Sequence, residues 1–457
     1  MGTIFQVEPS ARAGSERYAG HVNPQWARLL DLLQMNVRYE RCVGAELFTA
    51  DGRRILDFLS GYCVHNVGHN HPNVVRALHN ELERCGPAMI QTHVADLAGE
   101  LAEKLCQRAG GRLTKAFFNS SGSEGVEASI KFARAHTRRA GILSAEHAFH
   151  GLTCGALSLM SDPFWREGFG PLLPATVAVP FGDLDALESE LKTKQFAAFI
   201  VEPIQSEAGV CVPSADYLRT AESLCRHYGT LFVLDEVQTG MYRTGAFLAA
   251  HHFGVEPDMV ILAKAMSGGL VPCGAVLMSD AVCDSVYSSL PRAFVHTSTF
   301  SENSLSMRAA LATLEVLEAE QLGQRSIEAG EYLTARLREA LRDYEMVKEV
   351  RGVGLLMGIE FQAPKHLRLR IPFEAFGAVH PGMFGQILVM RLFRDSGFLT
   401  QVCGNNFMVL KVAPPLVVID AEMDAFVCAV QDVAELAHSP GAFWSEALGL
   451  ARRAFQA

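Results

Sequence analysis

The sequence predicts an α/β fold in which a mostly parallel sheet lies between layers of helices. Short apolar runs of strand length alternate with helical segments between about residues 74 and 330, a pattern typical of a parallel sheet covered by helices on both faces. Apolar residues make up 49% of the chain and charged residues 20%, which are globular values. Because 457 residues exceed what one simple core usually holds, we expect two or three domains.

The N-terminal part, residues 1–60, predicts one helix followed by strands. Between residues 23 and 42 the apolar side chains fall on one face of a helix, which indicates an amphipathic helix. These side chains are Trp26, Leu29, Leu30, Leu33 and Val37. Strand-like pieces follow at Glu46–Thr49 and Ile55–Leu59.

The central part, residues 61–330, carries the predicted large sheet. Its apolar runs are Lys115–Phe118, Gly141–Ser144, Thr176–Val179, Ala197–Val201, Leu231–Leu234, Met259–Leu262 and Gly274–Met278. Helical segments separate most of them, and a helix is predicted over residues 305–328. We expect this part to form the large domain.

The C-terminal part, residues 331–457, predicts a smaller α+β domain. A strand at 350–361, a helix at 386–397 and a strand at 406–412 follow one another. Between the first two lies a stretch, 362–383, that is rich in proline and glycine and also holds Phe373, Phe376 and His380. It is either an ordered surface excursion or a lid or wall for an apolar substrate, because long loops are often functional.

Composition and charge exclude several classes of protein. The net charge is −10 and no basic block is present, so nucleic acid is not an expected partner. No apolar run reaches the roughly 18 to 20 residues of a membrane helix, and residues 1–20 lack the apolar region of a secretion signal. The eleven cysteines are scattered, which favours reduced thiols in the cytoplasm over a disulfide frame or a metal site.

Two strands deliver opposite charges to one edge of the predicted sheet. The run 231–234 ends at Asp235, and the run 259–262 leads to Lys264, each followed by small residues. In open parallel sheets this edge is where ligands bind. A lysine that forms a Schiff base, facing an aspartate that keeps a pyridinium nitrogen protonated, suits pyridoxal 5′-phosphate (PLP). A desolvated lysine also has a lowered pKa and can act as base and acid.

An anion cradle is predicted where residues 121–123 open a helix. Ser121, Gly122 and Ser123 directly follow the strand 115–118, and the free N–H groups at a helix start bind phosphate well. The alternative is that Ser121 only caps the helix, with Glu124 in its first turn.

The chain resembles the class III aminotransferases of PLP fold type I, which include the ornithine, acetylornithine, 4-aminobutyrate and putrescine aminotransferases. The resemblance runs from about residue 44 to residue 416. Its ordered motifs are Asp51-Gly52-Arg53, Gly68-His69-Asn70-His71-Pro72, Asn119 to Ala128, Phe149-His150-Gly151, Val201-Glu202-Pro203-Ile204-Gln205, the Asp235 and Lys264 segments, Thr299-Phe300 and Ala413-Pro414-Pro415-Leu416.

The resemblance implies roles for further residues. Phe149 would stack on the pyridine ring beside His150, Val237 would press on the opposite face, and Gln238 would reach the phenolic oxygen. Glu202 would tune the hydrogen bonding around the ring. Ser298 and Thr299 would reach the phosphate of the neighbouring subunit, so a homodimer with shared active sites is implied. The family fold also implies that the N-terminal segment packs with the small domain.

Two departures from the family pattern bear on the substrate. Leu152 stands where relatives that bind amino acids often carry Arg or Lys, and Lys411 stands where relatives carry an Arg that binds the substrate carboxylate. Arg and Lys are not equivalent at a bidentate site. Glu207 matches the glutamate that pairs with that Arg, so a Glu207–Lys411 pair is predicted. With Tyr62 nearby, these changes favour a neutral, apolar aldehyde acceptor, and residues 406–415 resemble a subgroup acting on lipid-like or long-chain aldehydes.

The expected function is therefore ping-pong amino transfer from an amine donor to an aldehyde or ketone. An ornithine- or diamine-type omega-aminotransferase, and an aminomutase or racemase on the same scaffold, remain alternatives. A non-catalytic protein that keeps the fold is a further alternative, which the intact Asp235 and Lys264 oppose.

Overall fold

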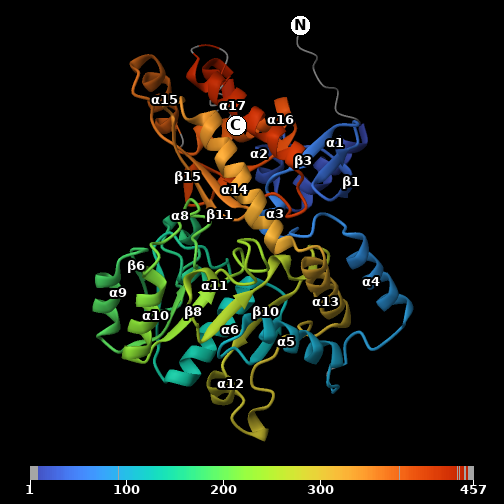
Figure 1. Ribbon diagram of the computed structural model, residues 1–457, viewed down its shortest axis with the longest axis vertical. Helices are drawn as coiled ribbons and strands as arrows, with labels where there is room; N and C mark the ends of the chain where they lie inside the picture. The colour runs from blue at the N-terminus through green and yellow to red at the C-terminus, as the bar shows by residue number, and fades with distance from the viewer. Residues whose placement is uncertain are drawn as a thin grey trace.

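The computed structural model describes residues 9–90, 92–379, 381–439, 441, 443–446 and 449–450. Figure 1 shows two parts, with the large sheet in the lower part and two smaller sheets in the upper part. The helix α14 (Leu322–Leu341) runs between them.

The large sheet has seven strands in the order β4-β10-β9-β8-β7-β5-β6. Neighbouring strands are parallel except at β10, which is antiparallel to both β4 and β9. The predicted mostly parallel sheet is thus confirmed. The strands are β4 (Lys115–Asn119), β5 (Gly141–Ala145), β6 (Thr176–Val179), β7 (Phe196–Val201), β8 (Leu231–Asp235), β9 (Met259–Leu262) and β10 (Gly274–Met278).

Helices cover both faces of this sheet. Alternate residues of β8 point to opposite faces: Val233 packs in one core with residues of α6 (Gly122–Thr137), and Phe232 packs in another with residues of α10 (Tyr217–Tyr228). Because both faces are buried, the inner strands β7, β9 and β10 consist entirely of apolar residues. The other helices of this part are α3 (Ser60–Cys63), α4 (Pro72–Glu83), α5 (Asp96–Ala109), α7 (Cys154–Ser158), α8 (Pro163–Arg166), α9 (Leu184–Leu191), α11 (Ala250–Phe253), η1 (Lys264–Ser267), α12 (Asp280–Val286), η2 (Leu290–Arg292) and α13 (Ser304–Ala319).

The upper part combines segments from near both ends of the chain. One sheet has the order β1-β2-β3-β13, in which β13 (Phe398–Leu399) pairs in parallel with β3 (Arg54–Asp57). The other is antiparallel, in the order β11-β12-β15-β14. Its strands are β11 (Val347–Val353), β12 (Leu356–Phe361), β14 (Gln401–Cys403) and β15 (Asn406–Val412). Helices α14, α16 (Met383–Ser396) and α17 (Asp420–His438) pack on this part, while the domain boundaries at 60 and 330 stay predictions.

The single helix predicted over residues 23–42 is wrong. After α1 (Pro9–His21), the structure has α2 (Pro24–Leu32) and then β1 (Tyr39–Val43). Gln34 adopts a left-handed backbone with φ 55°, which ends the helix. The following residues pair with β2 (Glu46–Thr49), with Arg41 opposite Phe48, so tertiary pairing overrides the helical pattern.

Two further predicted elements are each divided in two. The helix predicted over 305–328 covers nearly all of α13 and the start of α14, which are separated at Gln321, where φ is 51°. The strand predicted over 350–361 is a hairpin of β11 and β12 that turns at Gly354, where φ is 55°. Glycine adopts this conformation without steric strain, so Gly354 was the feature of the sequence that could have predicted the turn.

The stretch 362–383, predicted as a long loop, mostly forms the helix α15 (Leu367–Val379), although Pro372 lies inside it. Phe373 packs against Phe384 of α16, with ring centroids 5.3 Å apart, and this tertiary contact outweighs the proline. His380 lies outside the described residues. Figure 1 places α15 at the far end of the upper part.

Candidate active site

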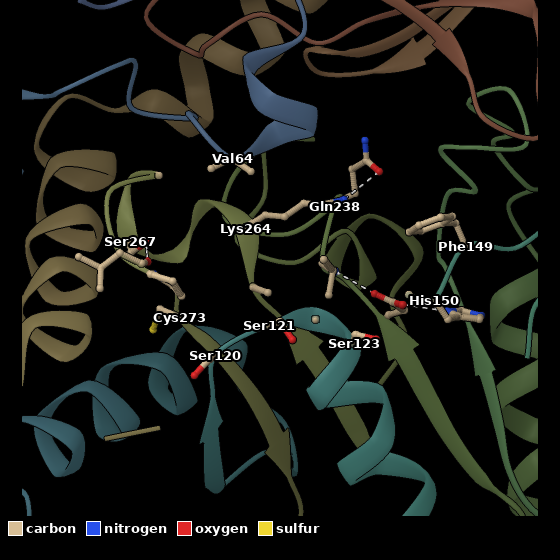
Figure 2. Close-up of a pocket in the computed structure, with 18 of the residues that line it drawn as sticks. Val64, Ser120, Ser121, Ser123, Phe149, His150, Gln238, Lys264, Ser267 and Cys273 are labelled. Atoms are coloured by element: carbon tan, nitrogen blue, oxygen red, sulfur yellow. Dashed lines mark hydrogen bonds and ion pairs between the residues drawn. The ribbon is translucent and has the colours of Figure 1, made fainter. Parts of the chain in front are cut away.

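A cavity of about 410 Å³ lies at one edge of the large sheet. The parallel strands β4, β5, β7, β8 and β9 all end at this edge, and the antiparallel β10 begins there, so each contributes residues at or shortly beyond a strand end. The lining includes Ser120, Ser121, Gly122, Ser123, Phe149, His150, Glu202, Asp235, Val237, Gln238, Lys264 and Cys273. Figure 2 shows the side chains converging on this space.

Lys264 projects into the cavity from the first residue of η1, shortly after β9. Its backbone has φ 45°, a left-handed conformation that is strained for residues other than glycine. Residues strained in this way cluster at functional sites. Its Nζ donates to Gln238 Oε1 at 3.2 Å. Burial lowers the pKa of the Lys264 ammonium, although the charge of Glu207 acts in the opposite direction. A lysine with a lowered pKa is a better nucleophile and base at neutral pH.

Asp235 ends β8 and is fixed on both carboxylate oxygens. Its Oδ2 lies 2.8 Å from His150 Nδ1, and its Oδ1 accepts from the N–H of Val237 at 3.1 Å. Both Asp235 and His150 are buried. Burial disfavours the charged imidazole, but the contact with Asp235 outweighs it, so the pKa of His150 is raised. The Asp235 carboxylate is therefore oriented inside the cavity wall.

Glu202 follows the last residue of β7 and receives two backbone N–H groups. Phe149 donates to Oε1 at 2.9 Å and Ser206 donates to Oε2 at 3.2 Å. Burial, together with the nearby negative charge of Asp235, raises the pKa of Glu202 to about 7, and His150 opposes this shift. This carboxyl group links the segment of Phe149 to the turn that follows β7.

The start of α6 lies at the bottom of the cavity in Figure 2. Ser121 Oγ accepts from the N–H of Glu124 at 3.2 Å, so the predicted capping contact is present. This contact satisfies the N–H of Glu124, whereas the N–H groups of Gly122 and Ser123, which line the cavity, have no intrahelical acceptor. Ser123 Oγ lies 2.8 Å from Thr153 Oγ1. A Cβ added at Gly122 would lie 2.8 Å from a Val237 methyl group, so the helix start and Val237 are in close contact.

Several predicted site residues lie outside the cavity lining. Ser298 donates to Glu124 Oε1 at 3.4 Å, near the start of α6, and Thr299 is exposed. Leu152 is 56% exposed, and α15 contributes none of the described lining residues. Within one chain the structure thus does not bring these residues to Lys264.

Glu207 and Lys411 form the predicted ion pair beside the cavity. Lys411 Nζ contacts Glu207 Oε1, and Lys411 is fully buried. Glu207 Oε2 also accepts from the N–H of Gly404 at 2.8 Å. The Lys411 ammonium lies 5.3 Å from the centre of the Tyr62 ring. Burial opposes both charges, but the pairing lowers the pKa of Glu207 and raises the pKa of Lys411.

The residues near the site that the sequence did not predict include Cys63, Thr153 and Cys273. Gln238 Nε2 lies 3.7 Å from Cys63 Sγ, Thr153 contacts Ser123, and Cys273 lines the cavity beside the start of β10. Thr153 closely follows the Phe149-His150-Gly151 motif and could have been considered with it. Cys63 and Cys273 carry no local signal, because their positions depend on how distant segments pack.

The donors present fit PLP. The cavity combines an amine with a lowered pKa, a fixed carboxylate, a flanking aromatic ring and a helix start with free N–H groups. Gly151 is required for its closed shape, because a Cβ there would lie 2.5 Å from Ser123 Oγ. Fold and site together define a PLP fold type I protein.

The comparisons with known proteins assign the family. The sequence pattern described as "Aminotransferase class-III" matches residues 31–434. An aminotransferase PigE of Serratia sp. (strain ATCC 39006) is 34% identical over 95% of this chain and 55% of its own length; the chain thus spans about half of that relative. A putrescine aminotransferase of Pectobacterium atrosepticum is 41% identical over 69% of each chain. An (S)-enantioselective omega-transaminase of Thermomicrobium roseum has a TM-score of 0.82 at 29% identity, covering 95% of this chain and 100% of that one.

The chain belongs to the class III aminotransferases. The predictions of this family, of its fold type and of PLP as cofactor are thereby confirmed. In the part of the chain that the structure describes, no helix has both the length and the apolar character needed to cross a membrane.

Proposed function

We propose that the chain is a PLP-dependent transaminase that transfers an amino group from an amine donor to an aldehyde or ketone acceptor by a ping-pong mechanism. The observation that carries this proposal is the placement of Lys264 and Asp235 in one cavity at the ends of adjacent parallel strands. When bound, the cofactor supplies an electrophilic carbon for amines and a ring that accepts electrons.

The residues of the chain divide the work among binding, charge and proton transfer. Asp235, held by His150 and Val237, presents a buried negative charge that favours a cation opposite it. The N–H groups at the start of α6 bind phosphate. Phe149 and Val237 would flank the ring, and Gln238, which accepts a hydrogen bond from Lys264 Nζ, would also reach the phenolic oxygen on the ring. Lys264, once its amine is free, takes a proton from the substrate carbon that bears the amino group and delivers it to a second carbon atom.

The substrate proposal follows from the Glu207–Lys411 pair. Glu207 already satisfies the Lys411 ammonium, and Lys411 cannot offer the two-pronged contact that an arginine gives a carboxylate. Leu152 adds no positive charge. A neutral, apolar aldehyde is therefore favoured as the acceptor. The Glu207–Lys411 pair would stay closed when this acceptor is bound and would open when a donor carboxylate binds.

A diamine donor is the second candidate. The 41% identity to a putrescine aminotransferase supports it, since a diamine also lacks a carboxylate for Lys411. An aminomutase or racemase differs in stoichiometry, because it needs no external acceptor.

We also propose a homodimer in the cytoplasm with shared active sites. Thr299 is exposed and is followed in sequence by Phe300, which is 64% exposed; Phe294, five residues before Thr299, is 71% exposed. Large apolar side chains that are this exposed in one chain favour a surface that a second subunit covers. In such a dimer Thr299 would serve the phosphate site of the partner.

Purified protein incubated with PLP tests the function. We expect borohydride to fix the cofactor on the peptide that contains Lys264, and a panel of amine donors with aldehydes of increasing chain length to give amine product. Lys264→Ala should lose both results. A protein that fixes no cofactor at this position, or that forms product without consuming an external acceptor, contradicts the proposal.

A further inference from the structure

A short turn after β7 carries Glu207 and connects the two parts of the molecule. Gln205 and Cys211 close it, because each donates its N–H to the carbonyl of the other, at 3.1 Å and 2.9 Å. We call residues 205–211 the pair-bearing turn. Its first half is tied to the large sheet, since Ser206 donates to Glu202.

One end of the pair-bearing turn is held by β15 and its hairpin. Lys411 pairs with the Glu207 carboxylate, and the N–H groups of Gly404 and Asn405 donate to the Glu207 carboxylate and carbonyl, at 2.8 Å and 2.9 Å. Glu207 is thus fixed from the sheet β11-β12-β15-β14, not from the large sheet that precedes it in sequence.

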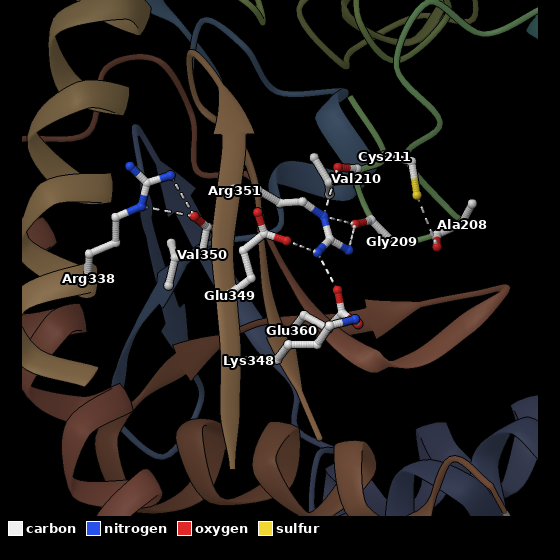
Figure 3. A network of polar contacts seen from close by, with 10 residues as sticks. All are labelled: Ala208, Gly209, Val210, Cys211, Arg338, Lys348, Glu349, Val350, Arg351 and Glu360. Atoms are coloured by element: carbon white, nitrogen blue, oxygen red, sulfur yellow. Dashed lines mark hydrogen bonds and ion pairs between the residues drawn. The ribbon is translucent and has the colours of Figure 1, made fainter. Parts of the chain in front are cut away.

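Arg351 of β11 holds the other end, as Figure 3 shows. Its Nη2 donates to the carbonyl of Gly209 at 2.7 Å, and its Nε donates to the carbonyls of Gly209 and Val210, at 3.1 Å and 3.2 Å. Its Nη1 contacts Glu349 at 2.9 Å and also Glu360. The two carboxylates are balanced by this guanidinium and by the Lys348 ammonium, which contacts Glu360 at 2.6 Å; the Arg351 side chain is mostly shielded from solvent.

The strand register explains why the two cations act on one turn. Arg351 lies opposite Gly358, and Gly358 lies opposite Lys411, across three adjacent strands. Gly358 leaves a notch between them: a Cβ there would lie 2.8 Å from a methyl group of Val409 and 3.3 Å from two carbon atoms of Val210. Val210 is fully buried and has φ 53°, a strained backbone that the surrounding contacts must enforce.

We propose that Arg351 is a positioning residue that clamps the pair-bearing turn and so keeps Glu207 on Lys411. The clamp favours the closed pair, which excludes a donor carboxylate from Lys411. Arg351 therefore biases the enzyme toward donors without a carboxylate near the reacting amine. This last step rests on the proposed transaminase function, whereas the effect on Lys411 does not.

Arg351→Ala in the holoenzyme tests the clamp through the accessibility of Lys411. Treatment with an amine-acylating reagent, followed by mass spectrometry, measures the modification rate of the peptide that contains Lys411. We expect an increase of about tenfold or more, the order of effect that losing charge-assisted hydrogen bonds gives. The ratio of kcat/KM for glutamate to that for 1-aminobutane should rise by about the same factor, mainly through KM.

Arg338→Ala is the matched control. Arg338 of α14 donates to the carbonyl of Val350, next to Arg351 in sequence, at 3.1 Å and 2.8 Å. The substitution removes the same kind of contact from β11 without touching the pair-bearing turn, so we expect unchanged labelling of Lys411 and an unchanged ratio of kcat/KM between the two donors.

Arg351→Lys separates the clamp from folding. A lysine can keep an ion pair with Glu360 but cannot contact two carbonyls and two carboxylates together, so it should fold and still raise Lys411 labelling. Equal labelling of wild type and both Arg351 variants, or an equal rise in the Arg338 variant, overturns the proposal. If no donor is turned over by any form, the proposed function fails while the labelling still decides about the clamp.

Discussion

Asp235 contributes a charge that no isosteric neutral group replaces. Asp235→Asn keeps the shape and one acceptor for the Val237 N–H, but it places a neutral amide beside His150. Because stabilisation by a fixed charge is lost, we expect kcat to fall by about 10²–10³-fold while folding is retained. Steady-state kinetics with a measured PLP content check this, and a variant with unchanged kcat would remove Asp235 from the chemistry.

The raised pKa of Glu202 predicts a pH-dependent stability. A carboxyl with a folded pKa of about 7, above its unfolded value, binds a proton more readily in the folded chain, so its contribution decreases as pH rises from 4.5 to 7. Between pH 5.5 and 7.5 the wild type should lose about 2 kcal/mol of unfolding free energy from this group. Glu202→Gln should not show this loss in urea titrations of the PLP-free protein, and identical pH slopes would refute it.

The buried Glu207–Lys411 pair predicts strong coupling between two substitutions. Lys411→Met leaves the Glu207 carboxylate buried without its cation, with the Gly404 N–H as its one remaining partner among the described residues, which should cost about 3–5 kcal/mol. Adding Glu207→Gln removes the stranded charge and keeps an acceptor for Gly404, so much of that loss should be recovered. Urea denaturation of the two single variants and the double variant measures the coupling; additive losses would contradict a buried pair.

At the scale of elements, the start of α6 has no room for a side chain at Gly122. In Gly122→Ala the new Cβ would press on the Val237 methyl groups, which should cost about 1–3 kcal/mol and weaken PLP binding. Gly99→Ala in α5 is the control, because nothing lies within 4 Å of its Cβ and a helical alanine should be neutral or slightly stabilising. Urea denaturation and PLP titration measure both, and equal behaviour of the two variants would argue against a tight contact.

The sequence predicted those elements whose pattern is local. The apolar runs of the large sheet end where their charged or small residues begin, so the structure agrees with them within about one residue. The elements that were wrong depend on partners outside the segment whose pattern was used: residues 39–43 pair with the following strand β2, and α15 forms against Phe384 of α16 despite Pro372. Likewise, the cavity residues that follow strand ends were predictable, whereas Cys63 and the Arg351 contacts were not, because sheet register places them.

At the scale of the whole molecule, one buried arginine joins parts that the sequence separates widely. Arg243 is fully buried and donates to Ser60, Asn66 and the carbonyls of Leu355 and Pro414. These contacts link the segment before α4, the loop after β8 and the sheet β11-β12-β15-β14. The N-terminal segment, the site and the C-terminal part are therefore held in one arrangement around the cavity.

The proposed sharing of sites between two subunits predicts that inactive variants rescue each other. Thr299→Ala should weaken PLP binding in its partner's site, and Lys264→Ala inactivates its own site. In a hybrid of the two, one site has Lys264 from the first subunit and Thr299 from the second, so it is complete. Random re-association should thus restore about one quarter of the wild-type sites. Activity and PLP content after mixing measure this, with each variant re-associated alone as control; no gain over these controls would place Thr299 in its own subunit's function or in none.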